Sequence, residues 1–195
     1  ENAVLKQLEN EMNVNIDFSS IMGMLKNPHI QSSNGVLLNC GNSISKIIGF
    51  VINEANEDEG KAIIAELKKL PKIDYNKMDE NDISVVENIM NAENFDLLEL
   101  LKGKSLDYSP ELDFTYKRVE NDDFRAQVDE LNFEFKDLEK AIELKSMEAI
   151  DKLSKNFSSP LFKKDYNGKK LYELSTKTSD SNFRSEFINK YGKYI

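Results

Sequence analysis

The sequence predicts an all-α protein built as a short solenoid of helix pairs. Apolar residues recur mostly at three- and four-residue spacing, which is typical of one buried face of a helix. Glycine and proline, which break helices, account for only 8 and 4 of the 195 residues. The apolar segments are only about ten residues long, and helices of that length need neighbours to be stable. Short helices in series therefore favour stacked units.

The chain begins with a predicted helical cap over residues 1–43. A helix over residues 18–25 is expected to end at Asn27, because the residue before Pro28 disfavours the α conformation. The apolar faces of the two cap helices consist of Leu5, Leu8 and Met12, and of Phe18, Ile21, Met22 and Leu25.

Two helix pairs are predicted over residues 44–105. A polar turn at residues 53–59 separates the helices of the first pair, Pro71 ends its second helix, and residues 72–76 form a short extended link. The four apolar faces consist of Ile44, Ile47, Ile48, Val51 and Ile52; Ala62, Ile63, Ala65, Leu67 and Leu70; Val85, Val86, Ile89 and Met90; and Phe95, Leu97, Leu98, Leu100 and Leu101.

Residues 106–135 form a predicted insertion that is rich in aromatic residues. Aromatic and arginine side chains are enriched at binding hot spots, so we expect a protrusion that contacts a partner. The alternative is that these side chains pack the insertion onto the solenoid. Residues 122–131 have the spacing of an amphipathic helix, with Phe124, Val128 and Leu131 on one face. The residues expected to bind are Tyr108, Phe114, Tyr116, Arg118 and Arg125.

Three segments of the chain align with one another, at residues 79–101, 138–153 and 165–175. They resemble the ankyrin repeat, whose pattern is D-x-x-G-x-T-P-L-H-x-A-A, a turn and a second helix ending in paired leucines. The matching positions are Asp79, Ser84, Val86, Ile89, Met90, Leu100 and Leu101; Leu138, Ala141, Ile142 and Leu153; and Asp165, Gly168 and Ser175. Ala141 and Ser175 are 34 residues apart, close to the family's period of about 33. Residues 136–195 are then further repeats with a C-terminal cap.

The sequence also departs from the ankyrin pattern. No segment carries an intact T-P-L-H, and Ile89 stands where the family has a small alanine. A larger residue at such a contact forces neighbouring helices to repack. A generic helical bundle is the alternative fold.

The resemblance implies a protein–protein interaction module that binds through its hairpin tips and its first helices. By position, the first-helix residues are Asn88 and Asn91. The tip residues are Tyr75, Lys77, Met78, Glu80 and Asn81, and Lys164, Tyr166 and Asn167.

No motif for chemistry accompanies these residues, so the interpretation is a binding protein, not an enzyme, with no cofactor and no metal. His29 is the only histidine and Cys40, expected to be buried, the only cysteine, which provides neither a nucleophile pair nor a zinc site. Residues 53–60 do not keep the register of a calcium loop, and no glycine-rich phosphate loop occurs. Two alternatives stay open: an accessory domain of a larger enzyme, and a helical enzyme that uses carboxylates such as Asp122 and Asp123.

Charge and composition narrow the partners. The net charge of −9 disfavours nucleic acid and is compatible with a protein partner that has a basic surface. No apolar run approaches the roughly 18 residues that cross a membrane, so no membrane insertion is expected. Only three of the 26 basic residues are arginine, a bias typical of AT-rich genomes. We therefore expect part of a host-directed effector or scaffold of a bacterium or intracellular parasite, located in the cytoplasm or a host cytosol. The chain starts at Glu1 and not at Met, so we expect a fragment or a processed form from which any targeting signal has been cut away.

Overall fold

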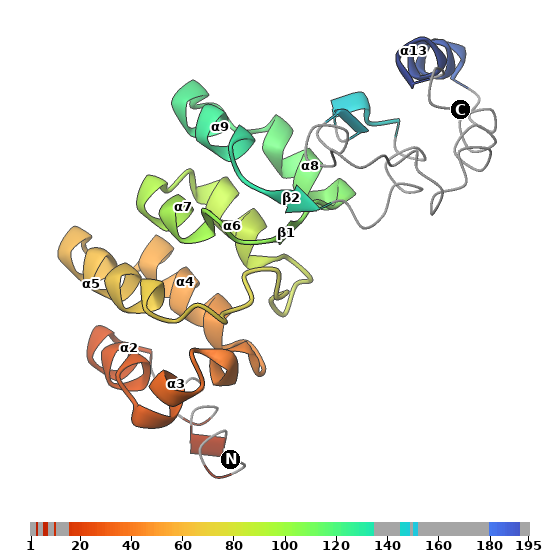
Figure 1. Cartoon of the computed structure of the whole chain (residues 1–195). Coiled ribbons are helices and arrows are strands. Elements are labelled where there is room, and N and C mark those ends of the chain that lie inside the picture. The colour runs from red at the N-terminus through yellow and green to blue at the C-terminus, as the bar shows by residue number, and fades with distance from the viewer. Residues whose placement is uncertain are drawn as a thin grey trace. The chain divides into compact units, whose positions relative to one another are not determined.

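The computed structural model describes residues 16–134, 145–148, 150–151 and 180–191, and four residues nearer the start, Ala3, Lys6, Gln7 and Asn10. This part of the chain is mostly helical, which confirms the all-α prediction (Figure 1). Outside the described residues lie Leu5, Leu8 and Met12 of the opening helix, most of the second repeat segment and all of the third, with Lys164, Tyr166 and Asn167. The chain forms two compact units, one of residues 1–102 and 119–130, the other of residues 103–118 and 131–195.

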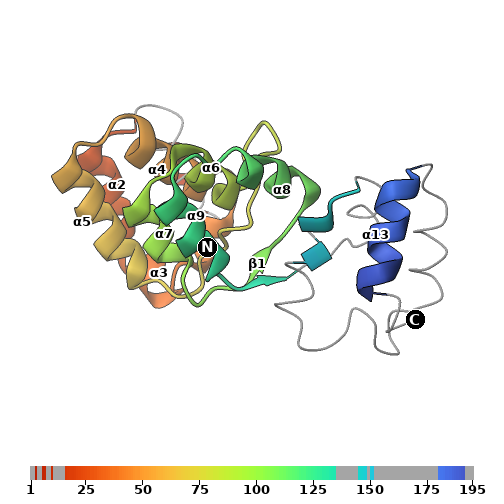
Figure 2. The same cartoon turned by 90° about the horizontal axis from the view of Figure 1, so that it is seen from above.

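In the first unit the helices pack in two rows. One row runs from α2 through α5 and α7 to α9, and the other from α3 through η1 and α4 to α6 (Figures 1 and 2). Contacts of α4 with α5 and of α6 with α7 join the rows. The elements are α2 (Phe18–Leu25), α3 (Pro28–Ser32), the 3₁₀ helix η1 (Val36–Asn39), α4 (Ser43–Asn53), α5 (Glu57–Lys68), α6 (Val85–Ala92), α7 (Phe95–Leu101) and α9 (Asp122–Asp129).

Short polar side chains set where most of these helices begin. Asn56 and Glu59 form a reciprocal capping box at the start of α5. The α6 helix begins after Ser84, whose hydroxyl accepts a hydrogen bond from the Glu87 N–H. The same kind of cap precedes α2, α3, α7 and α9, at Asp17, Asn27, Asn94 and Asn121.

The predicted apolar faces supply the core of this unit. Most of their residues are buried, as helical spacing requires when each helix has neighbours in both rows. Apart from Phe95, five predicted core residues are not fully buried: Ala65 is exposed, and Phe18, Met22, Ile52 and Ala62 are half-buried. Phe95 is partly exposed, but the edge of its ring meets Phe124 of α9, with centroids 5.3 Å apart.

The link between the two helix pairs is fixed by contacts with the loop around η1. The side chain of Asn39 donates to the Lys72 carbonyl at 2.9 Å and accepts from the Asp74 N–H at 2.7 Å. Gly35, with a φ of +93°, lies against Leu70 and Ile73 at this junction. The link is therefore a packed loop rather than a free connection.

The second unit contains the strands β1 (Leu106–Asp107) and β2 (Phe133–Glu134), which pair in parallel, and the helices α8 (Pro110–Lys117) and α13 (Ser181–Tyr191). Tyr108 is only 2% exposed and meets the ring of Phe133 at 5.2 Å. The Tyr108 hydroxyl donates to the buried Asp113 carboxylate, which also accepts from Ser146, both at 2.5 Å. Of the aromatic residues described between 106 and 134, all but Phe114 are buried.

Candidate partner-binding surface

The loop before α6 is held by its own backbone. Residues 77–82, called the tip loop below, are closed by a bridge between Met78 and Ser84. The Asp79 N–H donates to the Ile83 carbonyl at 2.8 Å, and the Val85 N–H to the Lys77 carbonyl at 3.0 Å. These bonds fix the shape of the loop before any partner arrives.

Asp79 is the centre of this loop. Its carboxylate accepts hydrogen bonds from the N–H groups of Asn81 at 2.8 Å and Ile83 at 3.0 Å, and from the side chain of Asn88 at 3.2 Å. Partial burial alone would raise the pKa of Asp79, but these hydrogen bonds outweigh it and hold the pKa below its ordinary value. Asp79 is therefore ionised, and it ties the loop to α6.

Four of the other side chains of the tip loop are exposed, and Lys77 is half-buried. Met78 is 48% exposed, and only three other large apolar side chains among the described residues are exposed: Val36, Phe95 and Phe114. Glu80, Asn81 and Asp82 are also exposed. The loop thus presents an apolar side chain among polar and acidic ones on a rigid support.

A polar groove of about 190 Å³ lies between the tip loop and the start of α4. Its lining residues are Asn42, Ser45 and Lys46 from the α4 side, and Asp79, Glu80 and Asn81 from the loop. The Asn42 amide donates to Glu80 at 3.3 Å instead of capping α4, so its side chain joins the two walls. The α4 residues of this groove were not predicted from sequence.

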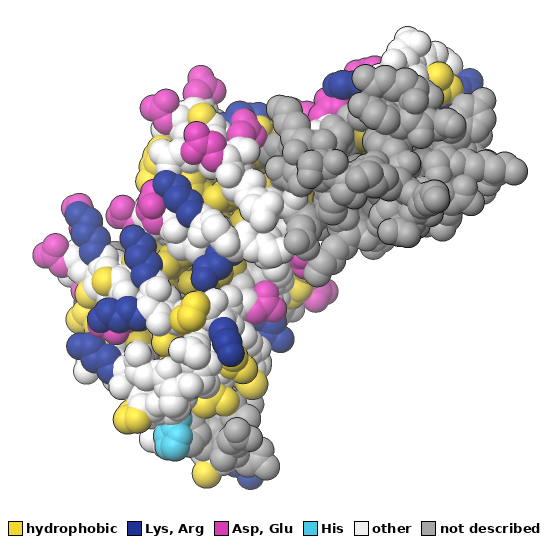
Figure 3. Space-filling model, viewed as in Figure 1, with side chains coloured by type: hydrophobic (Ala, Val, Ile, Leu, Met, Phe, Trp, Pro, Cys, Tyr) yellow, Lys and Arg dark blue, Asp and Glu magenta, His cyan; other side chains and the backbone are white. Residues whose placement is uncertain are grey.

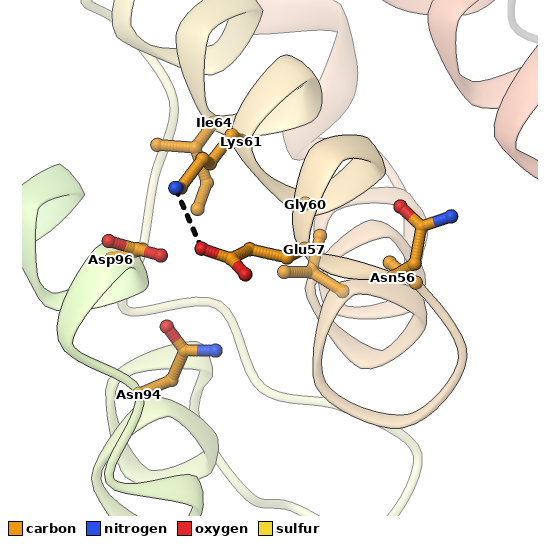
Figure 4. A pocket seen from close by; sticks show the side chains of 9 residues that line it. Asn56, Glu57, Gly60, Lys61, Ile64, Asn94 and Asp96 are labelled. Atoms are coloured by element: carbon orange, nitrogen blue, oxygen red, sulfur yellow. Dashed lines mark hydrogen bonds and ion pairs between the residues drawn. The ribbon is translucent and has the colours of Figure 1, made fainter.

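A second pocket, of about 180 Å³, lies where α5 and α7 begin (Figure 4). Val51 and Ile64 supply apolar lining, and Asn94 and Asp96 face the ion pair between Lys61 and Glu57, whose charged atoms are 2.8 Å apart. The hydrogen bond and the charge of Lys61 lower the pKa of Glu57, and those of Glu57 raise the pKa of Lys61. Because the pocket's cation is already paired within the chain, we regard this as the weaker candidate.

The structure corrects several of the predicted contact residues. Tyr75 is 3% exposed, and burial raises the pKa of its hydroxyl. Tyr108 and Tyr116 are buried as well, because they belong to the core of the second unit. None of the three can contact a partner in this conformation. Cys40, expected to be buried, is exposed.

Other predicted residues keep accessible positions. Asn91 is exposed on α6, whereas Asn88 is half-buried and bonded to Asp79. Phe114 is 58% exposed, and the Arg118 guanidinium lies 4.1 Å from the centre of its ring. Arg125 donates to the Val119 carbonyl at 2.6 Å. The structure thus brings Lys77, Met78, Glu80 and Asn81 together in one loop and places Phe114 with Arg118 in the other unit.

The described residues also show how charge is distributed and whether metal ligands or a membrane-crossing helix are present. Figure 3 shows side chains of both signs on one face of the first unit. Among the residues that the structure describes, no three His, Cys, Asp or Glu side chains gather as a metal ion would require. No helix in the described part is long and apolar enough to cross a membrane.

Comparisons with family models, with curated proteins and with solved structures find no match to this chain.

Proposed function

We propose that this chain is a protein-binding module that recognises its partner through the tip loop and the adjoining groove. The observation that carries the proposal is the combination of a rigid loop with an exposed Met78. An apolar side chain on a fixed loop contributes contact area on binding and loses little conformational freedom. The exposed Glu80 and Asn81 beside it supply polar contacts of the kind found at the rim of an interface.

We further propose that the helices of the first unit form an ankyrin-like stack. Support comes from the two rows of packed helices and from the loop that precedes α6. Asp79 and Ser84, two of the residues that carry the sequence resemblance, hold the loop and begin α6 respectively. The starts of α4 and α6 are 42 residues apart, longer than the ankyrin period of about 33, so the repeats are irregular.

Site-specific photo-cross-linking tests the proposal. A photoreactive residue at position 78 of the full chain is compared with one at position 68, since Lys68 is exposed on α5 and outside both pockets. In extract of the source organism, we expect a discrete adduct from position 78 and none from position 68. Equal adducts from both positions, or none from either, would exclude recognition by the tip loop.

A change at a single position tests the proposal better than a deletion of the aromatic-rich residues 108–133 would. Such a deletion removes Tyr108, Phe124 and Phe133 from the cores of the two units, so loss of binding would report only on folding.

A further inference from the structure

The tip loop is mainly acidic, whereas the groove beside it is lined by both acidic and basic residues. Three of its four charged side chains are acidic, Asp79, Glu80 and Asp82, and Lys77 is the only base. Glu80 and Asp82 are exposed, whereas Lys77 is half-buried. Lys46, the other base of the groove, belongs to α4. A partner that approaches the loop therefore meets mainly negative charge.

In the chain, Met78 stands directly before the two acidic residues Asp79 and Glu80. Its thioether side chain is flexible and polarisable, so it adapts to the shape of an apolar group placed against it. An exposed apolar side chain with carboxylates around it is complementary to an apolar residue with cationic neighbours. Acidic or phosphorylated segments would be repelled by the same carboxylates.

We propose that the partner of the tip loop is a basic segment of another protein, in which Lys or Arg residues flank an apolar residue. The apolar residue covers Met78, and the cationic side chains pair with Glu80 and Asp82. This inference rests on the proposed function and adds the chemistry of the partner. Exposed pairs of this kind are screened by salt, since the Debye length is about 8 Å at 0.15 M ionic strength. Binding is therefore salt-sensitive.

A selection from a library of random peptides displayed on phage tests the composition of the partner. The bait is the full chain, immobilised at low salt, and the selection is repeated on Met78→Ser. We expect the enriched peptides to combine an excess of Lys and Arg with an apolar residue, and Met78→Ser not to enrich them. Enrichment of acidic or neutral peptides, or of none, would overturn the inference.

Affinities of one enriched peptide, measured by fluorescence anisotropy, test the site. Glu80→Gln and Asp82→Asn are each expected to weaken binding about threefold, the effect of losing one exposed ion pair. Asp58→Asn removes the same charge from an exposed position at the start of α5, and Val36→Ser removes an exposed apolar side chain elsewhere. Both controls should leave the affinity unchanged. Equal losses in the controls and in the tip variants would show non-specific attraction and overturn the inference.

The two proposals fail in different ways. If a partner cross-links to position 78 but proves acidic or neutral at its contact, the basic-segment inference is wrong and the binding function stands. If basic peptides bind the tip loop while no partner cross-links there, the proposed function is wrong.

Discussion

Gly35→Ala probes the junction between the η1 loop and the start of the link before the tip loop. A Cβ at this position would lie 2.7 Å from Cγ1 of Ile73 and 3.0 Å from Cβ of Leu70. The Leu70 atom is fixed to the backbone, so it cannot rotate away. Forcing extra volume into a packed site typically costs about 1–3 kcal/mol. The φ of +93° adds about 1–2 kcal/mol for a residue with a side chain.

Alanine also lowers the conformational entropy of the unfolded chain, which offsets about 0.4–1 kcal/mol of this loss of stability. We therefore expect Gly35→Ala to lower the free energy of unfolding by about 2–4 kcal/mol. Urea denaturation followed by far-ultraviolet circular dichroism measures this change directly.

Alanine variants of two other glycines distinguish the cost of backbone strain from the cost of crowding. Gly41 has a φ of +58° and no atom within 4 Å of the added Cβ, so Gly41→Ala should cost only the backbone strain, about 1 kcal/mol. Gly49 lies inside α4, also with open space, so Gly49→Ala should stabilise the chain by about 0.5–1 kcal/mol. If Gly35→Ala costs no more than Gly41→Ala, the close approach of the two loops at this junction is refuted.

Three further predictions concern the hydrogen bonds of the two units. Asn39→Asp places a carboxylate oxygen against the Lys72 carbonyl, so it should lower the free energy of unfolding by about 1–3 kcal/mol, as measured by urea denaturation. The control Asn42→Asp breaks one weak exposed hydrogen bond and should cost less than half of that. Asp79 has a lowered pKa when folded; its stabilising contribution is therefore present above its unfolded value of 3.8 and lost as the pH falls below it through the folded pKa. In Asp79→Asn this part of the acid destabilisation should be missing, and an unchanged acid profile would contradict the role of Asp79. Asp113→Asn should speed hydrogen exchange in residues 145–151, because Ser146 and Tyr108 lose a charged acceptor. Glu111→Gln, on the exposed side of α8, should leave the exchange unchanged. Equal exchange in both variants would show that the hydrogen bond from Ser146 to Asp113 does not hold these residues in place.

The helices of the first unit could be predicted from sequence because their signals are local. Ile44, Ile47, Ile48 and Val51 repeat at helical spacing and are all buried in α4. Ser84 and Asn94 mark the starts of α6 and α7 with the side chains that cap helices best. Such features need only neighbours in the chain. Periodicity alone was sufficient to predict α4, and the caps at Ser84 and Asn94 are local signals that the prediction did not use.

The candidate site could be predicted only in part, because its geometry depends on residues far apart in sequence. The ankyrin resemblance predicts a hairpin tip at Met78, Glu80 and Asn81 from their positions, and all three are exposed. The other wall of the groove, at Asn42, is 38 residues from Glu80, and no local pattern indicates that pairing. Tyr75 was misplaced for the same reason: a tyrosine beside a turn is compatible with either face, and tertiary packing buries it.

The burial of Tyr75 changes how losses of binding are to be interpreted. Its carbonyl accepts from the Val86 N–H at 3.2 Å, and its side chain is only 3% exposed. Tyr75 therefore belongs to the core and is not part of the exposed binding surface. A substitution at Tyr75 removes a buried side chain, so any loss of recognition should come with a loss of stability. A substitution at Met78 removes exposed contact area and should leave the stability nearly unchanged. Measuring both the free energy of unfolding and the affinity for a partner at these two positions distinguishes a core residue from a contact residue. Position in the sequence alone does not make this distinction.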